Sequence, residues 1–165
     1  MLPSGISRSV YIEGLILLFR HGNKFFFKEY HRGNKLKPEE FASFRKLLGK
    51  TQKEISVLLG VSLKAVCSYE QGWRNIPVHV ERQILFLVFE KKGFSTKRRP
   101  CWEVLSCSQE LKECCPAWEF NAGELCWFIN GTICKGVMHK NWTEKIDICK
   151  KCKAFPSVFQ EVLNS

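Results

Sequence analysis

Residues 51–77, TQKEISVLLGVSLKAVCSYEQGWRNIP, decide the fold because they contain two short helices and a very tight turn between them. Thr51 stands at the start of the first helix with Glu54 three residues later, which is the spacing of a capping box. Gly60 ends this helix, and Ser62 caps the next one after a single further residue. Because so short a turn leaves no room for parallel packing, the two helices must cross steeply.

The flanking sequence predicts one helix on each side of this pair. Residues 38–48 begin with Pro38, which suits a first helical turn, and their apolar residues recur at helical spacing before Gly49. A further helix follows Pro77, and its apolar content predicts that it closes the core. The apolar residues on which these two predictions rest are Phe41, Phe44, Leu47, Leu48, Val80, Ile84, Leu85 and Leu87.

The quoted stretch resembles the Cro/repressor-type family, also called the XRE family. The resemblance lies in Thr-Gln opening the first of the two helices, Leu-Gly-Val-Ser at the turn, and Tyr-Glu-x-Gly ending the second. It implies a lambda-repressor-like domain of four or five helices over residues 38–90, about a third of the chain, that binds double-stranded DNA. Dimers are usual in this family, so it also implies a homodimer on a two-fold symmetric site.

The helix that begins at Ser62 is expected to lie in the DNA major groove and to contact bases through its outer face. By similarity to the family, Gln52 contacts a backbone phosphate, and Arg74 and Asn75 grip phosphate after the helix. Trp73 is expected to cover the core, and packing on the sugar–phosphate edge is the alternative. The expected DNA-binding residues are Gln52, Ser62, Leu63, Lys64, Ser68, Arg74 and Asn75, of which Leu63, Lys64 and Ser68 are predicted to point away from the core.

The charge of the chain is distributed unevenly. Residues 1–100 carry 19 Lys and Arg against 8 Asp and Glu, whereas residues 101–165 carry 7 against 8. The excess lies in the leader 1–37 and the linker 91–100, so these arms rather than the helical domain are expected to attract phosphate. The leader shows no clean period and is interpreted as a basic arm or as an extension of the reading frame upstream of the native start.

Eight of the nine cysteines lie between Cys101 and Cys152, which predicts a domain boundary near Pro100. Cys149 and Cys152 form a Cys-x-x-Cys knuckle whose two thiolates can face one ion. Cys114 is expected to be the odd thiol. The metal ligands are expected among Cys101, Cys107, Cys115, Cys126, Cys134, Cys149 and Cys152.

The segment 101–155 resembles a bacterial cysteine-rich module known as an appendage of sensory and regulatory proteins. The resemblance rests on two Cys-Trp pairs at 101–102 and 126–127, on Cys115-Pro-Ala, on Asn130-Gly-Thr-x-Cys134, and on the closing Cys149-x-x-Cys152-x-x-Phe155. It implies a module and no particular reaction.

A metal is expected because about 55 residues with scattered glycine cannot readily bury a sufficient core unaided. The sequence leaves zinc and an iron–sulfur cluster open. One alternative is a set of inert free thiols. The other is a set of disulfides, favoured by the even number of cysteines and by glycosylation-like triplets at Asn130 and Asn141. That alternative needs an extracellular location, whereas attached DNA-binding helices favour a reducing cytoplasm.

Together these features predict a mainly α protein: a helix-turn-helix domain (38–90), a basic linker (91–100), a small irregular, metal-stapled cysteine-rich domain (101–155) and a tail (156–165). The expected function is a sequence-specific DNA-binding transcriptional regulator with a cysteine-rich metal-binding or sensory module. The alternatives are a zinc-stapled interaction adaptor or a redox enzyme tethered to DNA, but no nucleophile–base pair or phosphate-cradling glycine loop supports an enzyme. No apolar run approaches the ~18 residues of a membrane span.

Overall fold

The structure is a computed structural model that describes residues 10–12, 15–17, 35–92 and 99–159. The chain divides into two compact units, Met1–Gly33 and Asn34–Ser165. In the first, β1 (Val10–Ile12) and β2 (Leu15–Leu17) pair as an antiparallel hairpin. Three predicted segments lie wholly or partly outside the described residues, and the predictions made for them stay predictions. They are the rest of the basic leader up to residue 34, linker residues 93–98 and tail residues 160–165.

The second unit is mainly helical, as the sequence predicted. It begins with α1 (Pro38–Leu47), α2 (Gln52–Leu58), α3 (Leu63–Glu70) and α4 (Val78–Lys92). In the part of the chain that the structure describes, no helix is both long and apolar enough to pass through a lipid bilayer.

Both predicted caps of the central helix pair are present. Thr51 Oγ1 accepts from Glu54 N at 3.2 Å, and Thr51 N donates to Glu54 Oε2 at 2.8 Å, which completes the capping box. Ser62 Oγ accepts from Ala65 N at 3.1 Å at the start of α3. Gly60 lies in the left-handed region with φ +64°, the conformation that lets the chain reverse after α2. The tight turn between α2 and α3 is therefore confirmed.

The cysteine-rich segment consists of short helices, one 3₁₀ turn and a two-stranded hairpin. Most of its helices have one turn, and only the last has nine residues. Asn141 caps this last helix through its Oδ1, which accepts from Glu144 N at 2.9 Å. The elements are α5 (Cys101–Val104), α6 (Gln109–Glu113), α7 (Pro116–Glu119), η2 (Gly123–Leu125), α8 (Cys126–Ile129), β3 (Ile133–Cys134), β4 (Val137–Met138) and α9 (Trp142–Lys150).

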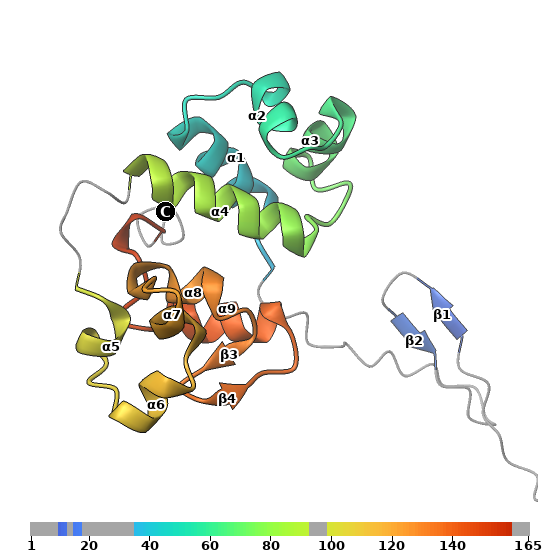
Figure 1. The fold of residues 1–165 in the computed structure, drawn as a ribbon. Helices are drawn as coiled ribbons and strands as arrows, with labels where there is room; N and C mark the ends of the chain where they lie inside the picture. Colours follow the sequence, from blue (N-terminus) through green and yellow to red (C-terminus); the bar gives the residue numbers. More distant parts are fainter. Residues whose placement is uncertain (1–9, 13–14, 18–34, 93–98, 160–165) are drawn as a thin grey trace, which may run out of the picture. The chain divides into compact units, whose positions relative to one another are not determined.

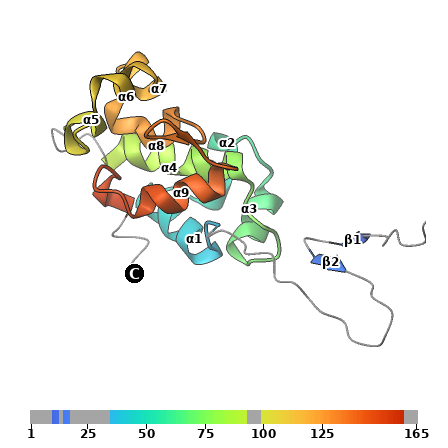
Figure 2. The ribbon, with the colours of Figure 1, turned by 90° about the horizontal axis from the view of Figure 1, so that it is seen from below.

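Helix α4 is covered on both sides. Phe41 and Phe44 of α1 are fully buried in the same core as the apolar residues of α4. Helix α4 therefore closes the core of α1–α3, as predicted. On its other side α4 meets the cysteine-rich segment: Phe86 stacks on Phe128 with ring centroids 5.2 Å apart, and Phe89 meets Trp127 edge-on at 6.2 Å. Figure 1 shows α4 between α2–α3 and α8–α9, and Figure 2 shows α8 and α9 against α4 from below. The two segments predicted as separate domains thus share one hydrophobic core.

A polar contact fixes this packing. Arg82 of α4 lies with its guanidinium carbon 4.8 Å from the ring centroids of both Phe128 and Trp142. Its Nη2 donates to the carbonyl oxygen of Phe128 at 3.2 Å. Cation–π contacts of this kind contribute most where water is excluded, so Arg82 helps to hold α8 and α9 on α4.

One carboxyl group is buried at the same junction. Glu81 of α4 is 1% exposed, and its Oε1 has no hydrogen-bond partner among the described residues. The pKa of Glu81 is raised to about 7, and burial is the main cause. The charges of Asp147 and Glu40 contribute to this rise, whereas those of Lys150 and Lys35 oppose it.

We expect Glu81→Gln to stabilise the protein at alkaline pH. Because the folded state binds the Glu81 proton more tightly than the unfolded chain does, this group lowers stability as pH rises from about 4.5 to about 7. The variant should match the wild type near pH 4.5 and exceed its free energy of unfolding at pH 8 by up to about 3 kcal/mol. Urea unfolding, followed by tryptophan fluorescence, measures the free energy of unfolding of both proteins at each pH. If the free energies of unfolding of the variant and the wild type differ by the same amount at every pH in this range, Glu81 does not titrate as a buried group.

Candidate functional site

The first turn of α3 faces outward. Leu63 is 44% exposed, and Ser62 and Lys64 are exposed beside it. The opposite side of the helix is fixed in the core by Ala65 and Val66. Capping engages the Ser62 hydroxyl as an acceptor but leaves its O–H free to donate outward.

Ser68 does not belong to this outer face. It is only 8% exposed, and its hydroxyl donates to the carbonyl oxygen of Lys64 at 2.8 Å. The prediction that Ser68 points away from the core is wrong, because it follows Ala65 by three residues and therefore lies on the same buried side of the helix.

The loop after α3 extends the exposed surface. Trp73 is 77% exposed, so our prediction that it covers the core is wrong. The backbone holds it outward: the amides of Trp73 and Arg74 both donate to the carbonyl oxygen of Ser68, at 3.0 and 3.3 Å. Arg74 and Asn75 are exposed, as a phosphate-contacting role requires. We call Ser62, Leu63, Lys64, Trp73, Arg74 and Asn75 the α3 surface.

A charged network behind α3 fixes its orientation. Arg45 of α1 donates through Nε to Glu70 Oε1 at 2.5 Å and through Nη2 to Glu70 Oε2 at 3.1 Å. Gln52 donates to Glu70 Oε2 at 2.8 Å and accepts from the Cys67 thiol at 3.4 Å. The side chain predicted to contact phosphate is therefore tied to α3. The sequence did not reveal the pairing of Arg45 with Glu70, because 25 residues separate them and nothing local links them.

The network keeps Glu70 ionised. Partial burial raises the pKa of Glu70, but hydrogen bonds from Arg45 and Gln52 and the positive charges of Arg45 and Lys46 outweigh it and hold the pKa below its usual value. The pair of Arg45 and Glu70 thus joins α1 to α3 through a charge-assisted bidentate contact, and the hydrogen bond from Gln52 joins α2 to the same carboxylate.

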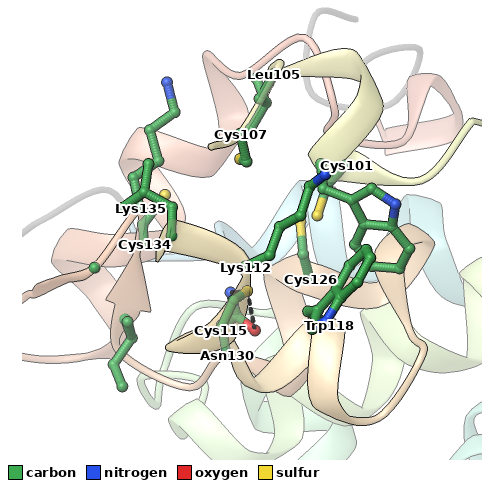
Figure 3. A pocket seen from close by; sticks show the side chains of 14 residues that line it. Cys101, Leu105, Cys107, Lys112, Cys115, Trp118, Cys126, Asn130, Cys134 and Lys135 are labelled. Carbon is green, nitrogen blue, oxygen red and sulfur yellow. Dashed lines mark hydrogen bonds between the residues drawn. The ribbon is translucent and has the colours of Figure 1, made fainter. Parts of the chain in front are cut away.

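The seven cysteines predicted as ligands surround two adjoining pockets. Five of them line one pocket, which Figure 3 shows from close by, with Trp102 and Trp118 in its wall at a ring-centroid distance of 5.0 Å. Cys149 and Cys152 line the adjoining pocket, and Cys114 is exposed outside both. The five are Cys101, Cys107, Cys115, Cys126 and Cys134, and two of them, Cys126 and Cys134, line both pockets.

Within this set, Cys101 and Cys126 form a hydrogen-bonded pair. The bond from Cys126 lowers the pKa of Cys101 and raises that of Cys126, so Cys101 ionises first. Burial raises the pKa of Cys134, and that of Cys149 to about 11, while the nearby Lys145 charge opposes both shifts.

The donor set fits a thiophilic metal in kind, since thiolates are preferred ligands of both zinc and iron–sulfur clusters. Over the described ranges, however, no three His, Cys, Asp or Glu side chains gather closely enough to hold an ion. All nine cysteines are free thiols.

Asn130 has a structural role in this segment. It is 8% exposed, its Oδ1 accepts from Ala117 N at 2.7 Å, and its Nδ2 donates to Cys115 Sγ at 3.5 Å. Because the Asn130 side chain is enclosed, it cannot carry a glycan in this fold. One of the two glycosylation-like triplets that favoured an extracellular protein is therefore not a glycosylation site.

Comparisons with protein-family models, with curated proteins and with solved structures found no match for this chain.

We expect Arg45→Met to lower the free energy of unfolding by about 2 kcal/mol, because it leaves the Glu70 carboxylate half-buried beside α3 with one partner fewer. The double variant Arg45→Met/Glu70→Gln should lose clearly less than the sum of the two single losses. Chemical denaturation of the four proteins measures the coupling, and strictly additive losses would show that the pair does not hold α3.

Proposed function

We propose that the protein is a sequence-specific DNA-binding transcriptional regulator of the Cro/repressor type. In this proposal α1–α4 form a lambda-repressor-like domain, and α2 and α3 form its helix-turn-helix. One observation supports it most: the first turn of α3 is exposed, while its other faces are fixed by the core and by the contact of Arg45 with Glu70. A rigidly held helix with an open outer face is what insertion into a major groove requires.

The α3 surface offers suitable chemistry for each part of a duplex. Lys64 can donate to guanine O6 or N7, and Leu63 can contact a thymine methyl group. Arg74 and Asn75 are placed to bind phosphate, and Ser62 can donate at the edge of the groove. Gln52 would reach a phosphate only by sharing or leaving its hydrogen bond to Glu70. A homodimer on a two-fold symmetric site in the cytoplasm completes the proposal.

The cysteine-rich segment supports the proposal by its position. It packs on the side of α4 that faces away from α2 and α3, and so leaves the α3 surface open (Figure 1). We propose that four of the seven pocket cysteines hold zinc or an iron–sulfur cluster once their side chains converge on it, and that the thiolate bonds then supply folding free energy to this segment.

Selection from a random duplex library by the full-length protein tests the DNA-binding proposal. We expect the wild type to enrich a defined motif. Lys64→Ala should weaken binding to that motif about tenfold or more and relax its preference at one base pair, because a base contact is lost.

The matched control is Lys140→Ala, which removes the same charge from an exposed position just before α9. It should keep both the motif and its affinity at the same salt concentration, apart from a small nonspecific loss. The proposal fails if the wild type enriches no motif, or if Lys64→Ala selects the same motif with unchanged affinity.

A further inference from the structure

One pocket of the cysteine-rich segment is lined by an unusual excess of positive charge. Its volume is about 560 Å³, which is in the usual range of small-molecule sites, and residues of α5, α8, β3 and α9 line it together with the stretch that follows α9. Four lysines stand in its wall, and no Asp or Glu of the described residues does. We call it the lysine pocket, after Lys135, Lys145, Lys151 and Lys153.

The rest of the segment does not share this excess. Residues 101–165 hold 7 Lys and Arg against 8 Asp and Glu, so the segment as a whole carries slightly more negative than positive charge. More than half of its basic residues nevertheless gather around this one pocket. Like charges that are brought together repel one another, and an anion bound among them replaces this repulsion by attraction.

The four lysines differ in depth. Lys145 is 1% exposed, and its Nζ is held by the carbonyl oxygens of Trp127 and Cys126 at 2.5 and 3.3 Å. The other three are exposed. The pocket therefore has one fixed charge that water screens poorly and three charges at the surface that can move toward a ligand on their flexible side chains.

Apolar side chains form much of the remaining wall. Trp127 and Phe155 are buried and meet edge-on with ring centroids 6.2 Å apart, and Leu105 and Ile148 line the same space. The four cysteines in the wall carry no charge as ordinary thiols at neutral pH. A wall that combines apolar groups with several cations fits a molecule that has an anionic head and an apolar body.

We infer that the lysine pocket is a binding site for a small organic anion, in which the lysines bind a carboxylate or phosphate head and the apolar wall encloses the body. The inference goes beyond the proposed function, because the residues that carry it are neither proposed metal ligands nor part of the α3 surface. Trp127 also packs on Phe89 of α4, so a ligand in this pocket lies one side chain away from the helix that supports α1 and α3.

Fluorescent dyes test this assignment on the full-length protein as purified. Anilinonaphthalene sulfonate (ANS) is an anion, phenylnaphthylamine (NPN) has the same rings without the charge, and both become brighter in an apolar site. We expect the wild type to bind ANS. Octanoate and octyl phosphate should displace it, whereas octylammonium, which has the same chain and the opposite charge, should not.

Charge variants at exposed positions locate the site. Lys151→Met/Lys153→Met should weaken ANS binding about tenfold and leave NPN binding unchanged, because each partly exposed ion pair contributes up to about fivefold in affinity. Ile148→Glu places a negative charge in the exposed part of the wall and should act in the same direction. Lys140→Met and Val137→Glu are the matched controls at exposed positions that do not line the pocket, and both should bind ANS as the wild type does.

Three results would overturn the inference. They are a wild type that does not bind ANS, displacement of ANS by octylammonium as readily as by octanoate, and pocket variants that keep the wild-type affinity for ANS or lose NPN equally. The metal content is measured in the same samples and DNA selection is measured separately. Failure of the proposed function is therefore distinguishable from failure of the lysine pocket.

Discussion

The whole second unit depends on covering both sides of α4. Ile84, Leu85 and Val88 are at most 2% exposed, and Phe86 and Phe89 face aromatic rings of the cysteine-rich segment. Residues 84–89 of α4 are apolar on every side and cannot remain at a surface, so α1–α3 alone would leave half of this stretch in water. The cysteine-rich segment supplies the missing cover, and since it occupies that side of α4, the outer face of α3 stays open.

This arrangement links the proposed metal centre to the proposed DNA-binding helices by direct contact. Trp127 packs on Phe89 of α4 and also contacts Phe159, which meets Phe44 of α1. The residue before Trp127 is Cys126, a member of both pockets, and Lys145 binds the carbonyl oxygens of these two residues. A change in the state of the thiols would therefore act within one or two contacts on the helix that supports α1 and α3. That is the physical basis on which a cysteine cluster could influence DNA binding.

The sequence predicted the features that depend on local spacing. Thr51 and Ser62 cap their helices and Gly60 turns the chain. The expected ligand cysteines line two adjoining pockets, but their side chains do not converge on one point. Two predictions about exposure were wrong. Ser68 follows Ala65 by three residues and lies on the buried side of α3, and Trp73 is held outward by backbone bonds that no side-chain pattern reveals. Lys145 was missed because a lysine in an amphipathic helix is ordinarily solvated, and only the fold places it among thiols.

The central claim is that the α3 surface is the part of the molecule that meets DNA. The most direct measurement is an NMR titration of the isotope-labelled full-length protein with its selected duplex, which follows every backbone amide and the indole N–H groups. The account predicts that the changes concentrate at residues 62–64 and 73–75, including the indole of Trp73. Changes centred on the cysteine-rich segment, with these residues unaffected, would contradict it.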